Sequence, residues 1–162
     1  MKKISILCTA VLLLGAMLFC GCAGNGDSIG NPKTFADENI SITLTDKFSE
    51  EKGALGFYAS YVSKNCGVVI YREGFDGQLG LENVPLSDYI NNNEPKELDT
   101  ETALKTNGEL KYWESQSETM YAQLYCFKGT DAFYRVRIFC SPKIVEEFSA
   151  YFLDWAKTVS VK

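Results

Sequence analysis

Histidine is absent from this chain of 162 residues, and several other residue types are scarce. Without histidine the chain cannot form a Ser-His-Asp or Cys-His catalytic arrangement, and it lacks the side chain that most often binds zinc and titrates near neutral pH. Arginine occurs only three times, against 13 lysines. These absences exclude most hydrolytic and zinc-dependent chemistries that a small enzyme would use.

Positive charge is also in the minority, with 16 basic against 21 acidic side chains and a formal net charge of −5. Hydrophobic residues make up 46% of the chain. That share, at this length and modest net charge, is typical of one globular domain that buries a real core and not of a disordered chain.

The N-terminus holds the one long apolar run of the sequence. Lys2 and Lys3 precede an apolar stretch over residues 4–19, which is the layout of a secretory signal peptide. The stretch ends in Phe-Cys-Gly-Cys-Ala-Gly at 19–24, which resembles a bacterial lipobox. We therefore predict a signal peptide over residues 1–21 and an N-terminal Cys22 that carries diacylglycerol and palmitate. The protein would then be anchored by lipid on the extracytoplasmic side of the cell membrane.

An uncleaved transmembrane anchor is the alternative interpretation. The apolar run falls short of the roughly 20 residues that span a bilayer, and Cys-Ala-Gly-Asn-Gly after it is typical of lipoproteins. Loss of residues 1–21 removes two lysines and no acids, so the remaining 141 residues carry 14 basic and 21 acidic side chains, a net charge of −7. Such a chain is not expected to bind nucleic acid, and its membrane contact is expected to come from the lipid.

Residues 22–37 are rich in glycine, asparagine and serine and predict a flexible tether, and residues 38–162 predict a single domain. Within this domain a short helix is predicted over residues 85–90 and an amphipathic C-terminal helix over residues 142–157. Mostly sequential antiparallel strands with a few covering helices make an α+β domain. Apolar patterns predict its strands over residues 39–45, 55–63, 66–72, 103–105, 109–114, 119–127 and 132–140.

The hairpin around Lys128-Gly129-Thr130 allows its register to be predicted. A three-residue loop pairs Leu124 with Tyr134, whereas an even loop would place Leu124 opposite an arginine. We therefore expect the odd loop, with the small apolar residues of the first strand on the same face as Tyr134.

Three cysteines remain after processing and lipid attachment: Cys66, Cys126 and Cys140. They show no zinc-binding spacing, and an odd number cannot all pair within one domain. The predicted register separates Cys126 from Cys140 by roughly 26 Å, so an internal disulfide would have to include Cys66. Its partner stays open, and three buried free thiols are the alternative.

Five segments of the domain carry a resemblance to a known fold. They are Ile-Ser-Ile-Thr-Leu at 40–44, Tyr-Arg-Glu-Gly-Phe at 71–75, Leu-Ser-Asp-Tyr-Ile at 86–90, the strand at 133–140 and Phe-Leu-Asp-Trp at 152–155. Together with the order of the elements, they resemble the PsbP-like fold, which bacterial DcrB-type lipoproteins share. The resemblance implies an α+β domain, predominantly an antiparallel sheet with a short helix and the C-terminal helix packed on it, over about residues 35–161. It implies a binding or accessory role and supplies no active site.

A ligand-binding site is predicted on the strand over residues 132–140. Arg135 and Arg137 lie on one face of this strand, about 6.6 Å apart by strand rise. A pair of guanidinium groups among aromatic rings can clamp a carboxylate or phosphate, so the expected ligand-binding residues are Arg135, Arg137, Phe133, Phe139 and Tyr125. The alternative is a strand covered by a helix, with both arginines paired to nearby acids.

These features favour a membrane-anchored, non-enzymatic binding or accessory domain. We expect its partner to be an envelope protein or a small ligand, and we expect no cofactor and no metal. The alternative is an envelope hydrolase that uses carboxylates or a thiol.

Overall fold

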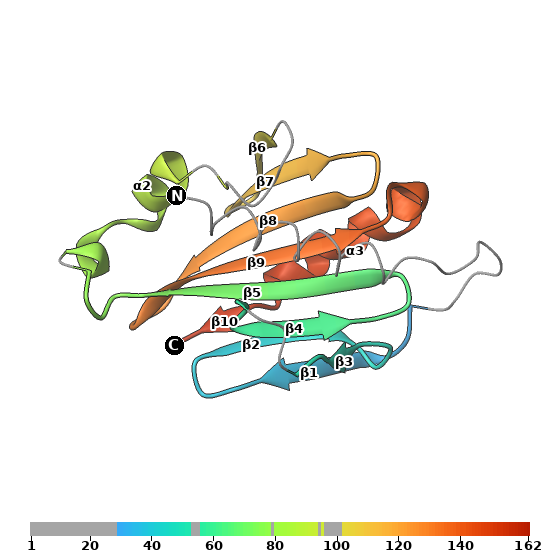
Figure 1. The fold of residues 1–162 in the computed structure, drawn as a ribbon, viewed down its shortest axis with the longest axis horizontal. Coiled ribbons are helices and arrows are strands. Elements are labelled where there is room, and N and C mark those ends of the chain that lie inside the picture. The colour runs from blue at the N-terminus through green and yellow to red at the C-terminus, as the bar shows by residue number, and fades with distance from the viewer. Residues whose placement is uncertain (1–28, 53–55, 79, 94, 96–101) are drawn as a thin grey trace, which may run out of the picture.

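A computed structural model describes residues 29–52, 56–78, 80–93, 95 and 102–162. The predicted signal peptide and Cys22 lie outside these residues. The main element is a fully antiparallel sheet of seven strands in the order β3-β4-β5-β9-β8-β7-β6 (Figure 1). Its strands are β3 (Ser49–Glu50), β4 (Ala59–Val62), β5 (Cys66–Gly74), β9 (Ala132–Cys140), β8 (Tyr121–Lys128), β7 (Leu110–Gln116) and β6 (Thr102–Asn107).

A second, smaller sheet has the order β1-β2-β10, with β1 (Pro32–Ala36), β2 (Ile40–Thr45) and β10 (Ser160–Val161). The prediction of a flexible tether up to residue 37 is therefore wrong for residues 32–36. β1 contains only one large apolar residue and is mostly exposed, so its own sequence gives little strand signal. It is ordered by antiparallel pairing with the apolar strand β2.

The C-terminal helix begins where the sequence predicts. Ser141 accepts a hydrogen bond from the Lys143 backbone N–H, and Pro142 opens a 3₁₀ turn, η2 (Pro142–Ile144), before α3 (Val145–Lys157). The predicted short helix is α2 (Leu86–Asn92), preceded by a 3₁₀ turn, η1 (Leu81–Asn83). No helix among the described residues is long and apolar enough to cross a membrane.

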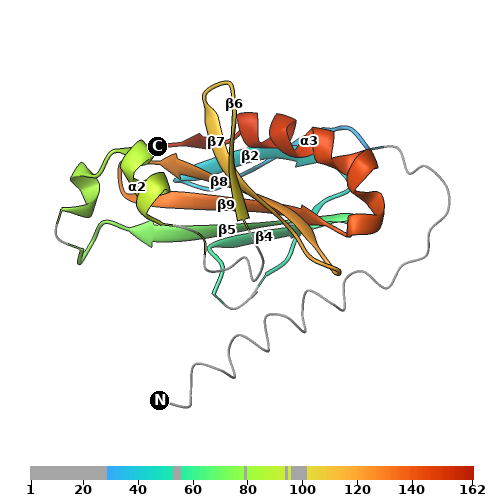
Figure 2. The ribbon, with the colours of Figure 1, turned by 90° about the horizontal axis from the view of Figure 1, so that it is seen from above.

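The main core lies between the large sheet on one side and α3 with the small sheet on the other. Figure 2 shows α3 and β2 on the same side of β5, β9 and β8. The helix contributes Phe148, Phe152 and Trp155 to this core, and β2 contributes the three apolar residues of its predicted alternation. The opposite face of the large sheet also buries apolar side chains, because α2 packs there with Tyr89 and Ile90.

The predicted register of the β8–β9 hairpin is wrong. Leu124 lies opposite Arg137, and Tyr125 lies opposite Val136. The loop is even, since Gly129 N–H donates to the carbonyl of Ala132 and leaves two residues between them. The prediction assumed that only one face of the hairpin was apolar, whereas both faces are buried and the arginines lie among rings on the second face.

Candidate functional site

The face of the large sheet opposite α3 carries two of the three arginines, and we call it the arginine face. Arg135 and Arg137 alternate along β9 with residues that point to α3, and both are half-buried. The guanidinium carbon of Arg137 lies 5.3 Å from the centre of the Phe139 ring, and that of Arg135 lies 5.4 Å from the centre of the Tyr71 ring. At these distances each cation is attracted by the face of its ring.

Arg137 and Arg72 differ in their hydrogen bonding. Its Nε is buried and has no hydrogen-bond partner, and its Nη2 donates to the sulfur of Met120. None of the ion pairs found among the described residues includes Arg137. By contrast, Arg72 donates two hydrogen bonds to Asp131, the shorter at 2.8 Å. A thioether is a weak acceptor, so Arg137 keeps donor capacity that a carboxylate or phosphate would use fully.

Arg135 borders an open hollow of about 640 Å³ at one side of this face. Tyr71 and Arg72 of β5 line it together with Arg135, so two guanidinium groups contribute to one concave surface. The other lining residues are Glu38, Asn39, Gly56, Phe57 and Tyr58. The hollow contains both a carboxylate and cations, and it is more polar than the pocket near α3 described below.

The two phenylalanines of the predicted site lie on the arginine face but are not exposed. Phe133 is fully buried and stacks on Tyr89 of α2, with ring centres 3.9 Å apart. Tyr89 is held in place by the hydrogen bond from its hydroxyl to Glu73, at 2.6 Å. Phe139 is 7% exposed and lies over Gly67, where no side chain intervenes. These rings are therefore packed into the sheet face, and they do not form an exposed aromatic groove.

Tyr125 does not belong to this face, so its inclusion in the predicted site is wrong. It lies on the side of α3, fully buried, and its hydroxyl donates to Gln123 Oε1. Gln123 donates in turn to the hydroxyl of Tyr121, which donates to Glu114 at 2.7 Å. Burial alone would raise the pKa of Glu114, but hydrogen bonds from Lys105 and Tyr121 lower it below its usual range. This polar chain satisfies groups inside the core and leaves no donor directed toward a ligand.

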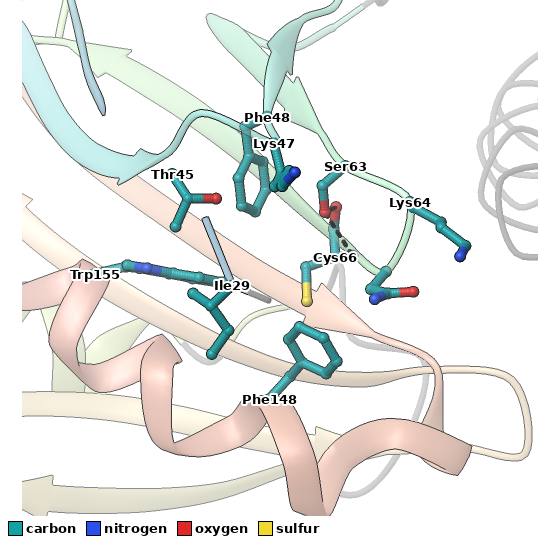
Figure 3. A pocket seen from close by; sticks show the side chains of 10 residues that line it. Ile29, Thr45, Lys47, Phe48, Ser63, Lys64, Cys66, Phe148 and Trp155 are labelled. Carbon is teal, nitrogen blue, oxygen red and sulfur yellow. Dashed lines mark hydrogen bonds between the residues drawn. The ribbon is translucent and has the colours of Figure 1, made fainter. Parts of the chain in front are cut away.

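A pocket that sequence reasoning missed lies between α3, β2 and the β4–β5 turn. Its volume is about 220 Å³, and Cys66 lines it (Figure 3). Only the cysteine gave a sequence signal for it, because the other residues come from segments far apart in the chain. They are Ile29, Thr45, Lys47, Phe48, Ser63, Lys64, Asn65, Phe148 and Trp155.

This pocket lacks the features of a thiol hydrolase. Its lining contains no carboxylate. Burial, the nearby Cys140 and the charge of Glu147 raise the pKa of the Cys66 thiol, whereas a catalytic cysteine needs a lowered pKa. Among the described residues no group of three or more Cys, Asp or Glu side chains is placed to hold a metal ion.

The fold has a counterpart among solved structures. The solution structure of cyanobacterial PsbP (CyanoP) from Synechocystis sp. PCC 6803 matches with a TM-score of 0.56 at 9% sequence identity, over 88% of this chain and 99% of that chain. At this identity the likeness shows the fold alone, and it confirms the predicted PsbP-like α+β architecture. No protein-family model and no curated protein matches the sequence.

Proposed function

We propose that this protein is a non-enzymatic accessory or binding domain, held by a lipid on Cys22 at the extracytoplasmic side of a bacterial membrane. We further propose that it recognises an anionic group of a small ligand or envelope protein through the arginine face. The signal-peptide pattern and the Cys-Ala-Gly-Asn-Gly sequence from Cys22 support the anchor. The PsbP-like fold supports a binding or accessory role.

The binding proposal depends on the hydrogen bonding of Arg137, whose buried Nε has no partner among the described residues and whose Nη2 donates to the sulfur of Met120. Holding an ionised guanidinium half-buried costs free energy unless its N–H groups are hydrogen-bonded. Its neighbours in register are Leu124 and Val69, which offer no side-chain acceptor. A carboxylate or phosphate from outside would supply the missing charge-assisted hydrogen bonds, and the contact with the Phe139 ring already orients the group.

Three arginines make this proposal testable by NMR, because their Nε–Hε resonances can be told apart by substitution. The protein is titrated separately with inorganic phosphate and with a hexaglutamate peptide. We expect the Arg137 resonance to shift and that of Arg72, already paired with Asp131, to stay in place. A charge-assisted hydrogen bond contributes about 1.5–3 kcal/mol, so Arg137→Gln should weaken binding by roughly 10- to 100-fold.

Lys157→Gln is the matched control, since it removes the same charge from α3, and Lys157 already contacts Asp154. If Arg137→Gln and Lys157→Gln weaken binding equally, the effect is one of net charge and the site is wrong. If neither probe shifts the Arg137 resonance at millimolar concentration, anion recognition by this residue is refuted.

The anchor is tested separately in a bacterial host by labelling with an alkyne analogue of palmitate. We expect the full chain to take up the label and to sediment with membranes. Cys22→Ala should lose both properties, whereas Cys20→Ala, two residues away, should retain them. Membrane binding that survives Cys22→Ala would show that the lipid is not the anchor.

A further inference from the structure

Two of the three domain cysteines are direct neighbours across the large sheet. Cys66 is the first residue of β5, Cys140 is the last residue of β9, and the two are paired in register. Both side chains belong to the core on the α3 side, with exposures of 2% and 0%. Cys126 points to the other face, opposite Arg135. The sequence left the partner of Cys66 open between Cys126 and Cys140, and of these two the sheet places Cys140 next to it.

The backbone of Cys66 shows which kind of antiparallel pair this is. Its N–H donates to Ser63 Oγ at 3.0 Å, and its carbonyl accepts from the N–H of Ser63 at 2.9 Å. Both groups therefore point to the β4–β5 turn and away from β9. In an antiparallel sheet such a residue forms a non-hydrogen-bonded pair with the strand on its other side, with Cα atoms about 4.5 Å apart and side chains at closest approach.

That spacing permits a disulfide, since bonded cysteines usually have Cα atoms about 4.4–6.8 Å apart. It lies within this range, near its short end. A disulfide can therefore form between these two residues, and thiol–disulfide exchange can form and break it reversibly.

The pocket beside α3 supplies a route to one of the two sulfur atoms. Figure 3 shows the sulfur of Cys66 pointing into the space between Ile29 and Phe148. The pocket volume of about 220 Å³ is that of several water molecules, which take up about 30 Å³ each. A small organic disulfide would therefore fit in it. Cys140 does not line this pocket, so an incoming reagent meets Cys66 first.

We propose that Cys66 and Cys140 form a reversible disulfide by exchange with a low-molecular-weight disulfide that enters this pocket. The Cys66 thiolate attacks one sulfur of the reagent, breaks its S–S bond and releases one thiol, which keeps the proton given up by Cys66. The Cys140 thiolate then attacks the Cys66 sulfur of the mixed disulfide and releases the second thiol. The two cysteines lose two electrons and two protons, and the reagent is reduced to two thiols. The reaction is independent of the function proposed for the arginine face.

The reaction should be slow at neutral pH and faster in alkali. Burial raises the pKa of Cys140 to about 12, and burial also raises the pKa of Cys66. Below its pKa, a thiol gains thiolate about tenfold per pH unit, and the thiolate is the attacking species. We therefore expect the initial rate to rise by about tenfold between pH 7 and pH 8.

The test uses the full chain with Cys8, Cys20 and Cys22 replaced by serine, purified in a mild detergent and incubated with bis(2-hydroxyethyl) disulfide. Mass spectrometry of unreduced peptides reads the products. We expect one species lighter by two hydrogens, with the Cys66 and Cys140 peptides linked, and with Cys126 still a thiol. Dithiothreitol should restore the original mass.

Variants of the domain cysteines separate the two steps. Cys140→Ala should stop at the mixed disulfide on Cys66, whereas Cys126→Ala should react like the parent. Circular dichroism of each variant confirms folding, and the parent's linked peptides provide the result even if one variant does not fold. A link to Cys126, a link between two chains, or a link formed only in urea would overturn the proposal.

Discussion

Gly67 is a position where one added methyl group tests the packing beneath the arginine face. It lies on β5 opposite Phe139 of β9. A Cβ atom at Gly67 would be 2.3 Å from Phe139 Cζ and 2.8 Å from Cε1 and Cε2, closer than real Cβ contacts come. The ring must therefore tilt, and the guanidinium of Arg137, whose central carbon lies 5.3 Å from the ring centre, must move with it.

Two effects of opposite sign act on the stability of Gly67→Ala. Alanine reduces the conformational entropy of the unfolded chain relative to glycine. Where the native backbone tolerates alanine, this stabilises the folded protein by about 0.4–1 kcal/mol. Overpacking a filled site costs about 1–3 kcal/mol. The steric cost should win, because Phe139 is 7% exposed and the methyl group meets three atoms of its rigid ring. We expect the free energy of unfolding to fall by roughly 1–2 kcal/mol. Each kcal/mol lost should lower Tm by about 2–8 °C.

Urea unfolding followed by tryptophan fluorescence measures this loss in a double-mutant cycle with Phe139→Leu. When the ring is gone, Gly67→Ala should cost less than about 0.5 kcal/mol, so the coupling free energy should exceed about 0.5 kcal/mol. A Gly67→Ala protein as stable as the parent would refute the reasoning. An equal cost in both backgrounds would show that the clash with Phe139 is not its cause.

Two further predictions concern stability. Burial alone would raise the pKa of Asp131, but hydrogen bonds from Arg72 and Tyr134 lower it below its ordinary value. The ionised carboxylate therefore stabilises the fold above the ordinary aspartate pKa, and this stabilisation is lost as the pH falls through the lowered pKa. The difference in unfolding free energy between the parent and Asp131→Asn should therefore shrink below about pH 4, and a constant difference down to pH 2 would contradict this. Phe152 of α3 is fully buried, so Phe152→Ala should lower the free energy of unfolding by about 3–5 kcal/mol. The adjacent Tyr151 is 36% exposed, so Tyr151→Ala should lower it far less in the same urea experiment. Equal losses would contradict the assigned burial.

Local patterns in the sequence predicted most of the elements. The alternation of Ile40, Ile42 and Leu44 predicted β2, and the Asn107-Gly108 pair predicted the β6–β7 hairpin. The stripe that contains Phe148 and Phe152 predicted α3. Each signal is local, since it depends on residues a few positions apart that share a face or form a turn.

The candidate site was predicted only in part, because its geometry depends on register. The sequence selected Arg135 and Arg137 and placed them correctly on one face of a strand. It also assigned Tyr125 to that face, and the structure shows Tyr125 opposite Val136 on the α3 side. Periodicity could not correct this error, since both alternating sets of β8 are apolar enough to be buried.

By itself the sequence determined the α+β class, most of the strands, the two α-helices, the lack of histidine chemistry and the pattern of an N-terminal lipid signal. Only the tertiary structure decided that residues 32–36 form a strand, which face carries the arginines, and that Cys66 lies beside Cys140 and not Cys126. The physical reason is the same for all three. Each depends on which strands pair and in which register, and the residues of a single strand do not determine this, least of all in the large sheet, which is buried on both faces.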